Sequence, residues 1–323
     1  MITDILLLIL GLTLIIGGAN FLTDGAAAIA RRTGMSDLVV GLTIVAFGTS
    51  APELVISVIS AIDGNAGIAV GNVMGSNIFN ILVIIGITAM VRPMPVDRSS
   101  MANEIPLVIL ASLALVIMAS TPLLDGTPEA VITRSDGLIL LLFFAIFMRY
   151  TFAQARRSDA PATPDSNQAG QMAVWRAAAY VAGGLGALIW GGQLFVDGAS
   201  AVASALGVSD AVIGLTIVAA GTSLPELATS VTAAIKGNPG IAIGNVIGSN
   251  IFNIFLVLGA AASCRSLPVG NITAVDLGTL LGSALLFYIF GRVIGTRTIT
   301  RAEGGVLTLC YAAYLTYLIV NIH

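Results

Sequence analysis

Two glutamates stand directly after prolines inside apolar stretches, and they are the side chains of this sequence best suited to binding a cation. Glu53 ends the motif GTSAPE, and Glu226 ends the motif GTSLPE. A carboxylate at the centre of a membrane helix costs roughly 2.5–3.5 kcal/mol on insertion scales, so such residues usually have a function. Hard cations such as Na+ and Ca2+ take carboxylate, hydroxyl and carbonyl oxygens as ligands. The two motifs therefore predict an ion site.

The proline of each motif is expected to break the helix that carries the glutamate. Proline has no N–H, so the carbonyl four residues earlier, at Gly48 or Gly221, loses its helical partner. Free carbonyl oxygens are therefore expected from about Ala46 to Gly48 and from about Ala219 to Gly221. Nearby hydroxyls can satisfy or supplement this exposed backbone, and they belong to Thr49, Ser50, Thr222 and Ser223.

A second motif, GNVxGSNIFN, follows each glutamate. Its polar residues step by four and so share one helix face; they are Asn72, Ser76 and Asn80 in the first copy, and Asn245, Ser249 and Asn253 in the second. Gly71 and Gly75 are expected to allow close approach of this helix to the helix of the first motif. The alternative is that the asparagines, or two protonated glutamates, only join helices by hydrogen bonds. As a set, these residues favour ion ligation.

Both motifs belong to one internal repeat. Residues 41–86 align with residues 214–259 without a gap, at an offset of 226 − 53 = 173, and roughly 32 of the 46 positions are identical. The match extends weakly upstream, where Asp24 aligns with Asp197. An odd number of expected spans separates the copies, so the second half enters the membrane in the opposite sense. Inverted repeats of this kind place a substrate site near the middle of the bilayer.

The composition supports a polytopic membrane protein. The chain has 323 residues, of which 57% are hydrophobic and only 10% charged, and its mean hydropathy is +0.98; a soluble domain carries about 25% charged residues. Apolar stretches long enough to cross a bilayer predict an all-α integral membrane fold of ten transmembrane helices. They lie near 3–30, 37–62, 67–91, 102–120, 135–152, 174–203, 210–235, 240–262, 272–291 and 302–321.

The distribution of arginine and lysine sets the expected orientation. These residues gather in the loops that follow odd-numbered spans, which should be cytoplasmic by the positive-inside rule, with both termini external. The segment 153–173 reads as a cytoplasmic linker between two five-helix halves, 1–152 and 174–323. Glu104, Asp276 and Glu303 are expected near the interfaces, solvated or paired.

Several function classes are disfavoured. The only histidine is His323, so zinc sites built on histidine and catalysis by Ser-His or Cys-His pairs have no basis. The charged residues are too few and too scattered for a nucleic-acid surface. We therefore expect a transporter in the lipid bilayer and no enzyme, with no cofactor and no nucleic-acid partner.

The two motifs, each present twice in inverted copies, resemble the cation/Ca2+ exchanger superfamily, in its bacterial-type sodium/calcium exchanger form. The resemblance covers the whole ten-span layout. It implies Na+/Ca2+ antiport by alternating access, in which the first and sixth spans slide past the bundle, in a multi-pass protein of the bacterial cell (inner) membrane. It also implies that Glu53 and Glu226 are the central carboxylates shared by Ca2+ and Na+.

Other ligands are implied by the same resemblance. Backbone oxygens would come from Thr49 and Thr222, Na+ sites from Ser50, Ser223, Ser76 and Ser249 with the carbonyls of Ala46 and Ala219, and the middle of the site from Asn80 and Asn253. Some members carry Asp at one of these last two positions, including K+-dependent exchangers. This chain has Asn at both, which argues against K+ dependence.

Other functions stay open. The strongest alternative is a Ca2+/H+ (or other divalent cation/H+) antiporter, although that branch usually has an Asn-Ala type sequence before its glutamate. A cation channel, which would conduct without a counter-ion, is a more distant alternative. A membrane hydrolase is disfavoured because the sequence offers no catalytic base. A monomer can contain the whole site, and the oligomeric state is open.

Overall fold

The computed structural model describes residues 2–157, 172–207, 219–270, 272–294 and 297–320, and it is built almost entirely of helices. Within these residues, eight helices are long and apolar enough to cross a membrane, and one bent pair makes a ninth candidate. The span expected at 210–235 begins outside the described residues, which include only its helical pieces Ala219–Gly221 and Leu224–Ile235. The structure is that of an all-α membrane protein.

The first half contains most of the expected spans at the expected places. In chain order its elements are α1 (Ile2–Thr33), α2 (Asp37–Val40), the π-helical η1 (Gly41–Val45), α3 (Ala46–Thr49), α4 (Ala51–Ile62), α5 (Ala66–Phe79), the π-helical η2 (Asn80–Ile85), α6 (Gly86–Val91), β1 (Met94–Pro95), the π-helical η3 (Ser100–Glu104), α7 (Ile105–Ala119), α8 (Thr121–Asp125), β2 (Val131–Ile132) and α9 (Arg134–Arg157). Helix α9 continues past residue 153, so the expected linker begins later than the sequence suggested. Most of that linker lies outside the described residues.

The second half repeats this order. Its described elements are α10 (Val174–Ala205), α12 (Ala219–Gly221), α13 (Leu224–Ile235), α14 (Pro239–Ile251), the π-helical η6 (Phe252–Leu258), α15 (Gly259–Cys264), β3 (Leu267–Pro268), α16 (Ala274–Ile289), the π-helical η7 (Phe290–Ile294), β4 (Thr298–Ile299) and α17 (Arg301–Val320).

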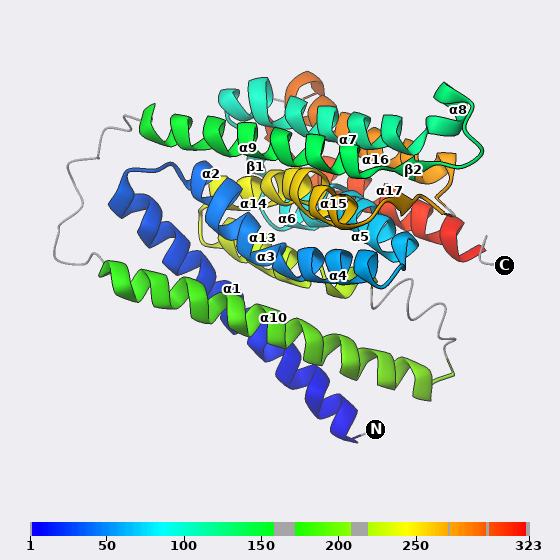
Figure 1. The fold of residues 1–323 in the computed structure, drawn as a ribbon. Coiled ribbons are helices and arrows are strands. Elements are labelled where there is room, and N and C mark those ends of the chain that lie inside the picture. Colours follow the sequence, from blue (N-terminus) through cyan, green and yellow to red (C-terminus); the bar gives the residue numbers. More distant parts are fainter. Residues whose placement is uncertain (1, 158–171, 208–218, 271, 295–296, 321–323) are drawn as a thin grey trace.

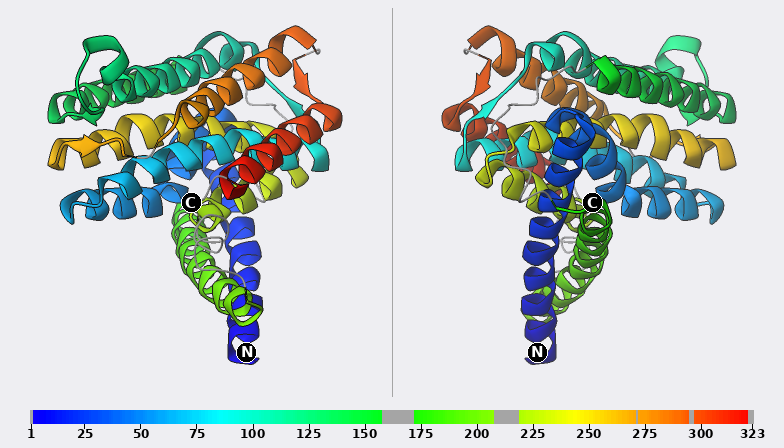
Figure 2. Two further views of the ribbon diagram at one scale, coloured as in Figure 1. Left: turned by 90° about the vertical axis from the view of Figure 1, so that its right-hand side faces the viewer. Right: turned by 90° about the vertical axis from the view of Figure 1, so that its left-hand side faces the viewer.

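The long helices α1 and α10 cross each other as a pair that projects from the other helices (Figures 1 and 2). Small residues allow this contact, because a Cβ added to any of several glycines would meet the partner backbone. At Gly18, for example, it would lie 2.8 Å from the carbonyl oxygen of Gly184. The glycines recur every seven residues in both helices, at Gly11, Gly18 and Gly25 and at Gly184, Gly191 and Gly198.

The centre of the structure is formed by the helices that carry the GNVxGSNIFN motifs, which are the most deeply buried of the membrane candidates. Glycines join the second copy to the first half, since a Cβ at Gly244 would meet the Leu38 carbonyl at 2.5 Å and one at Gly248 the Ala46 side chain at 2.6 Å. At Gly71 and Gly75, no described residue lies within 4 Å of an added Cβ. The structure shows close approach of this kind at the equivalent glycines of the second copy, whereas most of the residues that the repeat would place against Gly71 and Gly75 lie outside the described ranges.

Two short antiparallel ladders, which the sequence did not suggest, tie the halves together. Strand β1 pairs with β4, and β2 pairs with β3. Each ladder joins a loop of the first half to a loop of the second half, so the ends of the helix bundle are linked across the repeat.

Candidate functional site

Glu53 is positioned by the expected break in the second span. Ser50 has a non-helical ψ of 5° between α3 and α4, and the two helical parts differ in direction by 46°. Pro52 lies in the first turn of α4, where its missing N–H leaves no bond unmade. The Ala46 carbonyl is not free as expected, because the Ser50 N–H donates to it at 3.0 Å. The Thr49 hydroxyl also lies within hydrogen-bond distance of this oxygen, at 3.5 Å.

Glu226 is positioned in the same way in the inverted copy. Ser223 lies between α12 and α13 with a ψ of 5°, matching Ser50. Its N–H donates to the Ala220 carbonyl at 3.1 Å, one residue later than the bond seen in the first copy. Both glutamates are 1% exposed and lie in the first turn of a helix, where the partial positive charge of the helix N-terminus favours a carboxylate.

Side chains from the two halves meet between these broken helices. The Ser50 hydroxyl donates to the Glu226 carboxylate, with Oγ 3.2 Å from Oε1. The Thr49 hydroxyl lies 3.1 Å from Oδ1 of Asn245. Because Ser50 lies in the turn just before Glu53, the first of these bonds brings the Glu226 carboxylate beside the start of α4. The repeat thus brings Glu53 and Glu226 into one buried site, as expected.

Asn72 and Asn245 hold the second-motif helices against the glutamate helices. The Asn72 amide donates to the Ser57 hydroxyl at 3.0 Å and to the backbone carbonyl of Glu53 at 3.5 Å. The Asn245 amide donates to the Ser230 hydroxyl at 3.0 Å and to the carbonyl of Glu226 at 3.3 Å. The amide nitrogens of these two asparagines therefore join neighbouring helices by hydrogen bonds, which was the alternative to ion binding considered from the sequence.

Several buried side-chain oxygens in the two repeated motifs have no hydrogen-bond partner among the described residues. A buried acceptor without a partner costs about 1–3 kcal/mol, so native proteins rarely leave several together. Among those at the expected ligand positions are one oxygen of each central glutamate and the atoms Asn80 Oδ1, Asn253 Oδ1, Thr222 Oγ1, Ser223 Oγ and Ser249 Oγ, the glutamate atoms being Glu53 Oε2 and Glu226 Oε2. Because these atoms are carboxylate, amide and hydroxyl oxygens, their natural common partner is a hard cation.

The remaining expected ligands lie around this set. Ser76 is buried on α5. Asn80 begins the π-helical segment η2, and Asn253 lies in η6; a π-helical turn is a common local feature of functional sites. Ala219 is the first residue of α12, and nothing further is described for its side chain.

Sequence reasoning overlooked one pair of repeated asparagines. Asn77 is fully buried, and neither of its side-chain polar atoms has a hydrogen-bond partner in the described part of the chain. Asn250 donates to the Val246 carbonyl at 2.7 Å, and its oxygen has no partner there either. Their presence in both copies of the motif was the available signal. Among the described residues, no group of three or more His, Cys, Asp or Glu side chains could hold a metal ion.

The other intramembrane acids have structural partners. The Tyr150 hydroxyl donates to Glu104 at 2.8 Å, and the Tyr314 hydroxyl donates to Asp276 at 2.7 Å. Glu303 accepts the N–H and hydroxyl of Thr300 at the start of α17. All three acids are buried, so of the two expectations for them, pairing is confirmed and solvation is wrong.

Comparison with known proteins agrees with this geometry. The family model described as "Sodium/calcium exchanger protein" matches residues 3–153 and 176–320. The putative antiporter CaxA of Alkalimonas amylolytica is 36% identical, with 97% of this chain and 98% of the relative covered. The sodium/calcium exchanger MaX1 of Methanosarcina acetivorans is 33% identical, with 98% of each chain covered. The inner membrane protein YrbG of Escherichia coli is 38% identical, with 79% and 78% covered.

Solved structures give the same result. The sodium-calcium exchanger NCX_Mj, soaked with Na+ and Ca2+, superposes with a TM-score of 0.82 at 32% identity, and the match covers 100% of this chain and 99% of that one. The matches in sequence and in fold each extend over almost the whole chain, and the repeated motifs lie within them. This chain is a membrane transport protein of the sodium/calcium exchanger family.

Proposed function

We propose that this protein exchanges Na+ for Ca2+ at one site between Glu53 and Glu226, by alternating access. The observation that carries the proposal is the set of buried, unpartnered oxygens contributed by both halves. MaX1 and NCX_Mj are each named as sodium/calcium exchangers, which supports Na+ as the driving ion.

The charges of the site explain how the two fluxes are coupled in this proposal. Two carboxylates about 5 Å apart repel by about 3 kcal/mol at an effective dielectric near 20. One Ca2+, or at least two Na+, neutralises Glu53 and Glu226, and an empty site keeps both charges. Moving uncompensated charge past the apolar bundle is costly. The site therefore changes sides when it is occupied and resists doing so when it is empty.

The proposed ligands follow from the position of each oxygen. Glu53, Glu226, Asn80 and Asn253 form the centre, where both carboxylates and both amide oxygens have a free lone pair. The flanking hydroxyls and turn carbonyls would complete smaller sites for Na+; they are Thr49, Ser50, Ser76, Ala46, Thr222, Ser223, Ser249 and Ala219. The Asn245 oxygen lies 3.1 Å from the Thr49 hydroxyl, and we include the oxygens of Asn72 and Asn245 in the proposed ligand set. With Asn at both central amide positions, K+ is not required.

The proposed arrangement in the membrane has ten spans as two inverted halves, with both termini external. In this arrangement the second span is α2 to α4, bent at Ser50, and the seventh span ends with α12 and α13. The protein would reside in a bacterial inner membrane, which agrees with the name of YrbG. One chain contains all the proposed ligands, so a monomer is sufficient for transport.

Proteoliposomes test the driving ion directly. Vesicles loaded with Na+ are diluted into Na+-free buffer that contains radioactive Ca2+, at equal pH on both sides, and uptake is compared with vesicles that carry only a pH gradient. We expect uptake to follow the Na+ gradient and to stop when an ionophore collapses it. Uptake that follows the pH gradient without Na+ would replace the proposal by Ca2+/H+ exchange. Uptake with neither gradient would indicate a channel.

A further inference from the structure

The crossed helices α1 and α10 pack unequally against the two glutamate helices. Helix α1 lies along α13, which carries Glu226, whereas the described residues show no comparable packing of α10 on α4, which carries Glu53. Under the repeat offset of 173, α10 corresponds to α1 and α4 corresponds to α13. Among the described residues the two halves are therefore equivalent in sequence but not in contact, and we call the packed α13 side closed and the α4 side open.

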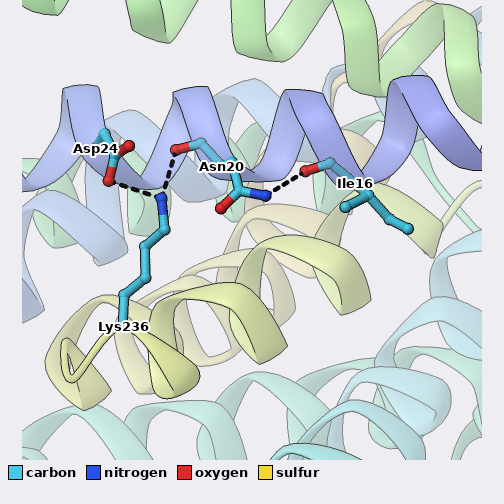
Figure 3. A network of polar contacts seen from close by, with 4 residues as sticks. All are labelled: Ile16, Asn20, Asp24 and Lys236. Atoms are coloured by element: carbon cyan, nitrogen blue, oxygen red, sulfur yellow. Dashed lines mark hydrogen bonds and ion pairs between the residues drawn. The ribbon is translucent and has the colours of Figure 1, made fainter.

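An ion pair holds the closed side. Lys236 follows the last residue of α13, and its Nζ lies 2.7 Å from Asp24 Oδ1 and 3.2 Å from the Asn20 carbonyl, both on α1 (Figure 3). The amide of Asn20 donates in turn to the Ile16 carbonyl at 2.9 Å. One lysine thus joins the end of α13 to the middle of α1.

The same positions on the open side carry like charges. The repeat offset relates Lys236 to Asp63 (236 − 173 = 63) and Asp24 to Asp197 (24 + 173 = 197). Asp63 caps the C-terminus of α4, as Lys236 caps that of α13, and Asp197 lies on α10. Both aspartates are exposed. If α10 closes on α4 as α1 closes on α13, two carboxylates come together where the closed side has an ion pair.

We infer that the Asp24–Lys236 pair is a latch that favours closure of α1 on α13, and that Asp63 and Asp197 disfavour the mirror-image closure. The inference rests on the proposed function, since alternating access requires a second state in which the open side closes. The charge asymmetry then sets the ratio of the two states, and the ions that bind at Glu53 and Glu226 act on a biased equilibrium. Lys236 is in this sense a positioning residue for transport and not a ligand.

Spin-label distances in the full-length protein test the latch without measuring transport. Cys264 and Cys310 are replaced by serine, and labels are attached at Ile62 and Leu206, which are exposed at the ends of α4 and α10 on the open side. Double electron–electron resonance on the protein in lipid nanodiscs then measures the distance between the two labels, and it reports the fraction of molecules in which this side is closed. Two variants isolate the charges, Asp63→Lys as the change and Asp63→Asn as its matched control.

Asp63→Lys would create a lysine opposite Asp197 in the mirror position of the latch. We expect the closed fraction to rise about two- to fivefold relative to the open fraction, the size that an exposed ion pair supports, and to rise less in Asp63→Asn. Lys236→Gln should shift the ratio in the same direction. Lys236→Arg should restore it, because a cation is kept; a purely structural role of the lysine side chain would not give this pattern.

The failure of the latch can be told apart from the failure of Na+/Ca2+ exchange. A distance distribution that is the same in the parent, Asp63→Lys and Lys236→Gln overturns the latch, whatever the transport assay shows. If the distributions shift as expected, the latch stands even where Ca2+ uptake proves to depend on a pH gradient instead of Na+. Folding of each variant is checked by its elution as a single species before labelling.

Discussion

Replacing Glu53 by glutamine removes one charge from the proposed site and changes its shape little. A carboxylate oxygen about 2.4 Å from Ca2+ contributes about 14 kcal/mol of attraction at an effective dielectric near 20, and dehydration of both partners offsets most of it. Removing one member of a buried charge pair costs about 2–5 kcal/mol net. Since Glu53 is 1% exposed and its Oε2 has no protein partner, no other group can take over. We expect Ca2+ affinity to fall about 30- to 5000-fold.

Equilibrium binding of radioactive Ca2+ to the purified protein measures this loss, and uptake into proteoliposomes measures its consequence. Glu303→Gln is the matched control, because Glu303 is also a buried membrane carboxylate but its bonds are to Thr300 at the start of α17. The control should lose some thermal stability and keep its Ca2+ affinity. A Glu53→Gln protein that binds Ca2+ within threefold of the parent would refute the assignment of the site.

Two further pairs of substitutions test individual contacts; Ser50 and Ser223 are equivalent in the repeat, and Gly244 and Gly278 differ in the space around them. Ser50→Ala removes a hydrogen bond to the Glu226 carboxylate, whereas the Ser223 hydroxyl has no hydrogen-bond partner among the described residues. We expect Ser50→Ala to lower ion-free stability by about 1.5–3 kcal/mol and Ser223→Ala to lower it much less, and equal losses in thermal unfolding would contradict this. Gly244→Ala places a Cβ 2.5 Å from a backbone carbonyl of α2, whereas Gly278→Ala meets nothing within 4 Å. Size-exclusion profiles should therefore show a destabilised Gly244→Ala protein, by about 1–3 kcal/mol, beside a normal Gly278→Ala protein.

Most of the fold follows from sequence because the bilayer imposes helices on apolar stretches of sufficient length. The break before Glu53 was predictable from Pro52 alone, and the structure bends the chain at Ser50 as expected. The ladders between β1 and β4 and between β2 and β3 were not predictable, since each strand has only two residues and its partner lies far along the chain. The helical extension of α9 into the expected linker likewise lacks a sequence signal strong enough to place its end.

The members of the site were predictable from the repeat, but their individual roles were not. Identical motifs indicate which residues meet, and the structure brings Glu53 and Glu226 together as the inverted copies imply. The motifs say nothing of the differences between copies, such as the bond from Ser50 to Glu226 that Ser223 does not reproduce with a protein atom. The charge contrast between Lys236 and Asp63 could likewise be read from the sequence, but its significance depended on the contact between Lys236 and Asp24.

The two small strand ladders also bear on how the chain is made. Strand β1 finds its partner only when β4 has been synthesised, and β2 only when β3 has been. Contacts between such distant segments form late in folding. During synthesis, Glu53 therefore enters the membrane before Glu226 and Asn253 have been made. The first half is therefore inserted before the strands that it pairs with have been made. We expect that cutting the coding sequence at the linker gives two fragments that become stable only when both are inserted in the same membrane.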